Sequence, residues 1–277
     1  MSALREFIEL HPRLAVLSGA GVSTSAGIPD YRDERGEWKR ARPVEFQPFM
    51  TNPGIRQRYW SRSTVGWPFV ARAQPSTAHR ALAQLETLGF VRLLITQNVD
   101  GLHQAAGSRN VIDLHGRLDT VRCMQCGHTL PRAGLQQTLL ANNPTWADIE
   151  GSIAPDGDVD IENRDYSGFV VPECPQCAGI LKPDVVFFGE PVPRERVERA
   201  FEAVAGSDAL LVVGSSLMVY SGFRFAEAAA AADKPIAAVN LGRTRADDLF
   251  ALKINAPCDE VLSALLATIG NIRTGAS

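Results

Sequence analysis

The sequence predicts an α/β protein whose main part is an open parallel sheet, interrupted by a helical insertion and a small cysteine-containing module. Three observations predict this class. Short apolar runs alternate with helical patterns, a glycine-rich turn follows the first apolar run, and two Cys-x-x-Cys pairs lie in a polar stretch that breaks the alternation. With 277 residues, 45% of them hydrophobic, the chain can bury a substantial core.

The predicted strands are apolar runs that are too short to form helices. Continuous rather than alternating apolar character is typical of parallel strands that are buried on both faces. The runs are Leu14–Leu17, Val91–Thr96, Val111–Leu114, Val185–Phe188, Ala209–Val213 and Ile236–Val239.

Helical patterns lie between several of these strands. Ser76 is a suitable N-cap for one of them and Gly89 a suitable stop. Strands that alternate with helices place a ligand crevice at the carboxyl ends of the strands. The expected helices are Ser76–Leu88, Arg194–Val204, Phe223–Ala232 and a last one from the cap Asp259 through Ile269.

Two segments break this alternation and are expected to be insertions. Residues 34–74 contain scattered prolines, arginines and aromatic side chains, which is typical of a helical insertion or lid. Residues 122–179 contain the paired cysteines and a middle rich in Gly, Pro, Asp and Asn, which predicts a small module. The sheet domain is then expected to comprise residues 1–33, 75–121 and 180–277.

The charge balance excludes some classes of partner. A formal net charge of −3, from 28 basic and 31 acidic residues with no long basic run, provides no electrostatic footprint for nucleic acid or membrane. Met1–Glu9 is charged and amphipathic, unlike a signal peptide, and no apolar stretch reaches membrane-spanning length. A cytoplasmic protein is expected.

The glycine-rich turn Gly19–Gly27 follows the first strand, where a dinucleotide pyrophosphate binds in open α/β sheets. Glycine lets the backbone approach phosphate oxygens, and a following helix favours an anion. The spacing differs from the G-x-G-x-x-G of ordinary dehydrogenases, because five residues separate Gly21 from Gly27. This difference disfavours a dehydrogenase.

Four of the five cysteines form two pairs, separated by 47 residues. Each Cys-x-x-Cys turn aims two sulfurs at one ion, and four thiolates suit one tetrahedral Zn²⁺. Disulfides or redox motifs are the alternative, but a cytosolic setting disfavours disulfides. Because sulfur would fill all four positions, the zinc is expected to be structural. The pairs are Cys123 with Cys126 and Cys174 with Cys177.

Polar side chains follow the second and third predicted strands. Gln97–Asp100 follows one of them and His115 the next, so both are expected at the same crevice. Such residues can simply satisfy a turn. A neutral imidazole is, however, the natural base near pH 7, and its position favours a catalytic role for His115. His11 and His79 are expected to be structural, whereas the role of His103 stays open.

These motifs, in this order and spacing, resemble a sirtuin over nearly the whole chain. The ending of the first motif and the long loop between the cysteine pairs resemble the class II branch, which includes the mitochondrial sirtuin 4. The matching segments are Gly19–Arg32, Thr96–His103, His115-Gly116, the two cysteine pairs, Pro183–Glu190, Gly214–Leu217 and Asn240–Gly242.

The resemblance implies a Rossmann-like NAD-binding domain and an NAD-dependent protein lysine deacylase that carries one structural zinc. The products would be nicotinamide, O-acyl-ADP-ribose and the deacylated lysine. His115 matches the general base, which draws a proton through the ribose hydroxyls, and Asn98 completes the catalytic pair. Proteins with acylated lysines are the expected partners, and a monomer is the expected oligomeric state.

The resemblance also assigns binding positions. The cofactor positions are Gly19, Ala20, Gly21, Ser23, Ile28, Asp30, Tyr31, Arg32, Trp38, Gln97, Asn98, Val99, Asp100, Gly214, Ser215, Ser216, Asn240, Leu241, Gly242 and Cys258. The substrate positions are Val186, Phe187, Phe188, Gly189 and Glu190, which are expected to form an extended strand that pairs with the substrate backbone.

One departure bears on the substrate. Tyr31 replaces the phenylalanine that is common in the family and adds a hydroxyl near the acyl group, which would alter acyl preference. Glu37, beside Trp38-Lys39-Arg40, does not suit an anionic acyl chain, so acetyl-lysine is the default expectation and longer acyl groups stay open. Mono-ADP-ribosyl transfer is the alternative activity. A non-catalytic NAD-sensing module is a weaker hypothesis, because a binding module needs the pocket but not the base.

Overall fold

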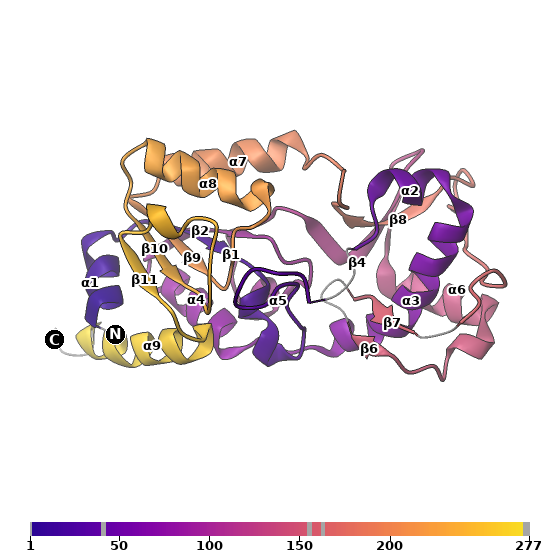
Figure 1. Cartoon of the computed structure of the whole chain (residues 1–277), viewed down its shortest axis with the longest axis horizontal. Helices are drawn as coiled ribbons and strands as arrows, with labels where there is room; N and C mark the ends of the chain where they lie inside the picture. Colours follow the sequence, from indigo (N-terminus) through magenta and orange to yellow (C-terminus); the bar gives the residue numbers. More distant parts are fainter. Residues whose placement is uncertain (1, 40–42, 154–156, 162–163, 274–277) are drawn as a thin grey trace.

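The computed structural model describes residues 2–39, 43–153, 157–161 and 164–273. The molecule has a larger lobe built on a parallel sheet and a smaller lobe that contains the long helix α3 (Figure 1). Both ends of the chain lie at the far end of the larger lobe. No helix in the described part of the chain is both long enough and apolar enough to cross a membrane.

The sheet of the larger lobe has six strands, all parallel, in the order β11-β10-β9-β1-β2-β3. Five of the six predicted strands are therefore confirmed. The short edge strand β11 was not predicted, because its three half-buried residues include a lysine. The strands are β1 (Leu14–Ser18), β2 (Val91–Thr96), β3 (Val111–Asp113), β9 (Ala209–Val213), β10 (Ile236–Val239) and β11 (Leu252–Ile254).

Helices cover both faces of this sheet (Figure 1). Side chains alternate between the two faces, so that Leu14 and Val16 of β1 pack against α1, α4 and α9. Ala15 and Leu17 pack against α7 and α8 on the opposite face. These helices are α1 (Ser2–Leu10), α4 (Thr77–Thr87), α7 (Arg194–Ala205), α8 (Tyr220–Ala231) and α9 (Cys258–Arg273).

The helix predictions hold within a few residues at their ends. Ser76 caps α4 as predicted, because its hydroxyl accepts a hydrogen bond from the His79 amide and the His79 ring accepts one from the Ser76 amide. The short elements of this lobe are η1 (Ala20–Val22), η2 (Thr24–Ala26), α5 (Leu102–Ala105) and η4 (Asp247–Leu249).

The smaller lobe contains a three-stranded antiparallel sheet in the order β5-β4-β8, together with three α-helices. The prediction of a parallel strand over Val185–Phe188 is wrong. The strand there is β8 (Leu181–Val185), and it pairs with β4 in this second sheet. The other elements are α2 (Phe46–Thr51), α3 (Pro53–Arg72), β4 (Gly116–Cys123), β5 (Thr129–Pro131), α6 (Arg132–Asn142), η3 (Pro144–Trp146), β6 (Ser152–Ile153) and β7 (Val159–Asp160).

One apolar cluster fills the smaller lobe. It joins Phe49 and Trp60 from α2 and α3 to Leu135 of α6 and to Cys123 and Cys174. The described parts of the expected helical insertion and of the expected cysteine module therefore share one core. Residues 40–42 and 154–156 of these segments, together with 162–163, lie outside the described residues, and the domain boundaries stay a prediction.

Candidate active site and metal centre

A cavity of about 450 Å³ lies where the two lobes meet. It opens at the carboxyl ends of β1, β2, β9 and β10, where the sequence predicted a ligand crevice. Most of the predicted site residues line it. From the predicted set these are Gly19, Ala20, Gly21, Asp30, Tyr31, Arg32, Trp38, Gln97, Asn98, His115, Val186, Phe187, Phe188, Gly189, Glu190, Gly214, Ser215, Ser216, Asn240, Leu241 and Cys258.

Five predicted residues do not line the cavity but support those that do. Ser23 and Asp100 form a hydrogen bond behind Asn98, and Ile28 and Val99 belong to the core of the smaller lobe. Gly242 lies beneath the segment after Arg32, because a Cβ there would be 2.5 Å from the Glu34 carbonyl oxygen.

The glycine-rich turn packs tightly against the end of β9. The Gly19 amide donates to the Val213 carbonyl at 3.1 Å, and the Gly21 amide donates to the Gly214 carbonyl at 2.8 Å. A Cβ on Gly19 would lie 2.7 Å from the Ser215 Cβ atom. These two glycines therefore allow two backbone turns to meet, and their own amides are already used within the protein.

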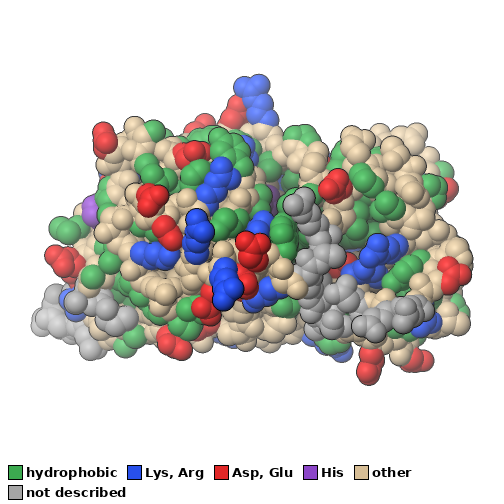
Figure 2. Space-filling model, viewed as in Figure 1, with side chains coloured by type: hydrophobic (Ala, Val, Ile, Leu, Met, Phe, Trp, Pro, Cys, Tyr) green, Lys and Arg blue, Asp and Glu red, His purple; other side chains and the backbone are tan. Residues whose placement is uncertain are grey.

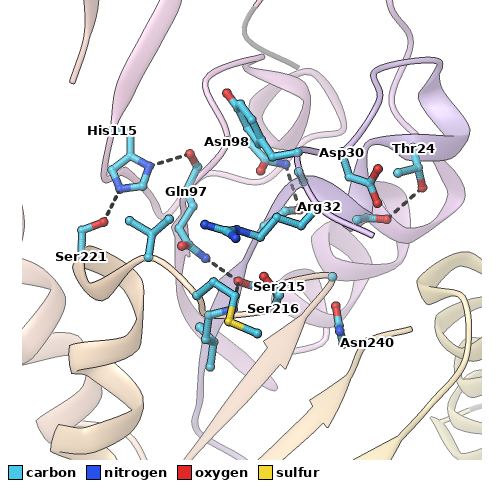
Figure 3. A pocket seen from close by; sticks show the side chains of 18 of the residues that line it. Thr24, Asp30, Arg32, Gln97, Asn98, His115, Ser215, Ser216, Ser221 and Asn240 are labelled. Atoms are coloured by element: carbon cyan, nitrogen blue, oxygen red, sulfur yellow. Dashed lines mark hydrogen bonds between the residues drawn. The ribbon is translucent and has the colours of Figure 1, made fainter. Parts of the chain in front are cut away.

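Asn98 and Gln97 cross the floor of the cavity from the end of β2. The Asn98 amide nitrogen donates to the Gly19 carbonyl and to the Ser23 hydroxyl, each at 3.1 Å. The Gln97 amide nitrogen donates to the Ser215 hydroxyl at 2.7 Å (Figure 3). These contacts connect the ends of β1, β2 and β9, so the polar side chains are held in fixed positions before a ligand arrives.

His115 lies beside this floor with both ring nitrogens hydrogen-bonded (Figure 3). Nδ1 is 2.9 Å from the Gln97 carbonyl oxygen, and Nε2 is 2.8 Å from the Ser221 hydroxyl. A carbonyl oxygen only accepts, so Nδ1 carries the proton and Nε2 is the basic atom. Burial lowers the pKa of His115 to about 4, with smaller contributions from Arg224 and Arg196. The imidazole is therefore neutral at pH 7.

Two other histidines, His79 and His103, are fully buried and have structural contacts. The ring of His103, whose role the sequence left open, is fully buried and lies 4.6 Å from that of His79, centre to centre. His103 Nε2 contacts the Ser18 hydroxyl at 2.8 Å, and His79 belongs to the cap of α4, as its structural assignment predicted. Burial lowers the pKa of His79 to about 4 and that of His103 well below its usual value.

These three neutral histidines predict an acid-sensitive fold. Each folded-state pKa lies below the unfolded value of about 6.5, so the stabilisation is complete above that pH and declines as pH falls toward 4. We expect the free energy of unfolding to fall below pH 6.5, with a slope approaching about 1.4 kcal/mol per pH unit for each group. Urea unfolding at pH 7.5, 6.5 and 5.5 measures this, and a constant free energy of unfolding would contradict it.

The segment Val186–Glu190 forms one wall of the cavity. The Val186 amide donates to the His115 carbonyl at 2.8 Å, and the Phe188 carbonyl accepts from the Phe46 amide. Glu190 Oε2 accepts from the Phe187 amide at 2.9 Å and from the buried Lys182 amine at 3.1 Å. The carboxylate of Glu190 thus holds its own loop in shape.

Three aromatic side chains that line the cavity lie against one another. The ring of Trp38 lies 6.2 Å from that of Tyr31 and 5.7 Å from that of Phe188, each in an edge-to-face arrangement. The Arg32 guanidinium lies 4.0 Å from the centre of the Trp38 ring. The aromatic rings give this part of the cavity an apolar surface that suits the aliphatic stem of a long side chain.

The sequence did not single out several lining residues. They include Thr24, Met218, Val219 and Ser221, and the last three precede or begin α8. The signal for Thr24 was its place inside the glycine-rich turn, and that for the other three was their position after the predicted Gly214–Leu217 motif. A segment that follows a strand at its carboxyl end lies at the crevice, whatever its composition.

The four predicted cysteines lie together, with all Sγ atoms within 4.8 Å of one another. The Cys123 and Cys177 sulfurs are 3.5 Å apart, and those of Cys126 and Cys174 are 3.8 Å apart. Four sulfurs at about 2.3 Å from one Zn²⁺ are separated by about 3.8 Å, so this tetrad fits a tetrahedral zinc.

The backbone around the tetrad also agrees with the predicted turns. Gly127 and Ala178 each follow the second cysteine of a pair, and both have positive φ, +73° and +57° respectively. Each of these residues donates its amide to the carbonyl of the first cysteine of its pair. The small residues thus permit the tight turns that aim the sulfurs at one point.

Comparison with known proteins is consistent with both sites. The NAD-dependent protein deacetylase of Bordetella bronchiseptica is 61% identical over 267 residues, which cover 96% of this chain and 97% of the relative. A solved structure of Sir2 with a p53 peptide and NAD⁺ matches with a TM-score of 0.80 at 28% identity, over 98% of this chain and 99% of the other. Sir2 bound to acetylated peptide matches with a TM-score of 0.77 at 28% identity, over 98% of both chains.

A family model described as the Sir2 family matches residues 19–221. This span begins at the glycine-rich turn and ends at the first turn of α8, so it includes the cavity floor, His115 and all four paired cysteines. The family match, the close bacterial relative and the shared fold agree with the resemblance found in the sequence. The chain therefore belongs to the Sir2 family of sirtuins.

Proposed function

We propose that this protein is an NAD-dependent protein deacetylase whose cavity brings NAD and an acetylated lysine together. The observation that carries the proposal is the neutral imidazole of His115, which lines the cavity and keeps its basic Nε2 deprotonated. The deacetylase relative and the Sir2 structures with NAD⁺ and acetylated peptide support the same activity.

The residues that line the cavity would divide between the two ends of a dinucleotide. Asn240, Leu241 and Cys258 line the cavity near the ends of β10 and α9 and would hold the adenosine. Ser215 and Ser216, at the end of β9, would meet the phosphates or a ribose. Gly19 and Gly21 have no side chains, so they leave space in this part of the cavity.

Asn98 and Asp30 would bind the nicotinamide end. Asn98 is anchored to the glycine turn and to Ser23, and Asp30 lines the same part of the cavity and forms an ion pair with Lys39 at 2.5 Å. Bound NAD supplies the nicotinamide leaving group and the ribose carbon that takes up the acyl oxygen. The protein therefore has mainly to align two substrates, for which a cavity between two lobes is suited.

His115 would accept the proton of a ribose hydroxyl. The base must be neutral, and its lowered pKa keeps it so throughout the physiological range. The Gln97 carbonyl, which accepts from Nδ1, also stabilises the imidazolium that forms. The Val186 amide donates a hydrogen bond to the His115 carbonyl, so the predicted substrate segment Val186–Glu190 is connected directly to the base.

Incubation with NAD and a panel of acyl-lysine peptides tests this activity. We expect equal amounts of nicotinamide, deacetylated peptide and O-acetyl-ADP-ribose, measured together by mass spectrometry. A mass gain of one ADP-ribose on a protein, without loss of the acyl group, would instead indicate mono-ADP-ribosyl transfer. Nicotinamide release that does not depend on any acyl peptide would contradict the deacetylase.

Tyr31 is the residue that we expect to tune acyl preference. It lines the cavity in edge-to-face contact with Trp38, at a position where phenylalanine is common in the family. Tyr31→Phe removes one hydroxyl and keeps the ring. We expect the ratio of kcat/KM for acetyl over longer, apolar acyl groups to fall about 3- to 10-fold, since one polar contact is worth about 0.5–1.5 kcal/mol. An unchanged ratio would remove Tyr31 from the acyl site.

The finer assignments follow the sequence. The Pro29–Arg32 ending supports the class II branch that includes sirtuin 4. Acidic and basic side chains intermingle on the face shown in Figure 2, which supports protein substrates rather than nucleic acid or membrane. A cytoplasmic monomer is the proposed form of the protein.

A further inference from the structure

The first turn of α8 contacts His115, the proposed base, directly. Gly222 lies so close to the Gln97 side chain that a Cβ there would be 2.4 Å from Gln97 Oε1. This close approach brings the preceding residue, Ser221, to the edge of the cavity, where its hydroxyl is 2.8 Å from His115 Nε2 (Figure 3). A larger residue at position 222 would push the helix and its serine away.

The direction of this hydrogen bond follows from the other ring nitrogen. Nδ1 donates to the Gln97 carbonyl, so Nε2 has only a lone pair, and the Ser221 hydroxyl must donate to it. One contact alone would allow the ring to swing about its bond to Cβ. Two contacts, one at Nδ1 and one at Nε2, fix the plane of the ring and direct the Nε2 lone pair toward Ser221.

We propose that Ser221 is a positioning residue for His115: its hydroxyl holds the imidazole ring in plane and neutral until a sugar hydroxyl takes its place on Nε2. The inference rests on the proposed role of His115. No covalent bond to Ser221 forms or breaks. When the substrate binds, the sugar hydroxyl becomes the donor to Nε2, and its proton then passes from the sugar oxygen to that nitrogen.

The charged groups around the His115 ring also favour its neutral form. Arg196 of α7 and Arg224 of α8 face it, and both disfavour a second positive charge. Arg196 lies 3.6 Å from Asp184 of β8, and the Arg224 side chain donates to the Ser221 carbonyl at 3.0 Å. Arg224 thus fixes the turn that carries the serine. A donor on the lone pair favours neutral imidazole further, so removing the hydroxyl should make His115 more basic.

The test compares Ser221→Ala with Ser221→Thr, which keeps a hydroxyl. In the free protein, an NMR titration of the His115 ring should show a pKa about half a unit to one unit higher in the alanine variant, as expected for the loss of one hydrogen bond. Deacetylation kcat/KM for NAD should fall about 3- to 10-fold, because the free enzyme loses its oriented ring. At saturating NAD and peptide, kcat should stay within twofold, because the sugar hydroxyl then occupies Nε2. The threonine variant should restore the pKa and kcat/KM.

Ser263→Ala is the matched control, because Ser263 is a helical serine that donates to the Asp259 carbonyl in α9 and does not line the cavity. Its His115 titration and kcat/KM for NAD should equal those of the wild type. The proposal is overturned if Ser221→Ala leaves the pKa of His115 unchanged, if its kcat/KM for NAD equals or exceeds that of the wild type, or if threonine behaves like alanine. The titration needs no substrate, so it tests the contact even if the deacetylase assignment fails.

Discussion

Replacing His115 with alanine should reduce deacetylation about 10²- to 10⁴-fold, the usual contribution of a positioned general base. Nε2 is the deprotonated ring nitrogen that faces the Ser221 side of the cavity, and the Gln97 carbonyl holds it there. NAD affinity should change only a few-fold, because the glycine turn, Ser215 and Asn240 stay in place. Nicotinamide release and peptide mass measure the first effect, and calorimetric titration with NAD measures the second.

His11→Ala is the matched control for this experiment. His11 follows α1, contacts the Phe7 carbonyl and does not line the cavity, so the same substitution there should leave kcat unchanged. The assignment of the base fails if His115→Ala turns over like the wild type. A variant that loses NAD binding as well would show that the ring supports the pocket rather than the chemistry.

The pH profile adds a second criterion for the base. The neutral form is the active one, so kcat/KM should fall only as pH drops through the pKa of the free enzyme, which burial lowers to about 4. The rate should therefore be flat from pH 8 to pH 6, where an ordinary histidine would already lose activity. Stability must be followed in parallel, because the same histidines weaken the fold below pH 6.5.

The larger sheet could be predicted because its strands are buried on both faces. Runs such as Ala209–Val213 are continuously apolar, and β9 has these bounds in the structure. The strand β8 was missed because its side chains include Lys182 and Asp184. Lys182 is buried and donates to the carboxylate of Glu190, eight residues further along the chain, a pairing that no local pattern reveals.

The site was predictable to the extent that it follows from topology. Parallel strands bring their carboxyl ends to one edge, so Gln97, Asn98 and Ser215 had to meet there. Ser221 was not predictable, because its role depends on how closely α8 approaches Gln97. That approach is set by a lone Gly222, and a glycine near the start of a helix gives no signal of a tertiary contact.

Replacing Cys174 with serine should abolish zinc binding and unfold the smaller lobe. The Cys174 sulfur lies 3.8 Å from that of Cys126, and both belong to the tetrad. Binding of structural zinc is worth about 10–16 kcal/mol in small domains, which is comparable to the whole stability of a typical protein. We expect zinc content to fall from about one atom per chain to near zero, with a large drop in the midpoint of thermal unfolding.

Activity should be lost with the metal, although the zinc has no place in the reaction. Cys123 and Cys174 belong to the same apolar cluster as Val185 and Phe187, so loosening the tetrad loosens the wall of the cavity that faces the substrate. Cys258→Ser is the control, because this buried thiol contacts the Val239 carbonyl in the other lobe and should leave zinc content unchanged. Full deacetylation by a zinc-free Cys174→Ser protein would show that the core of the smaller lobe forms without the metal.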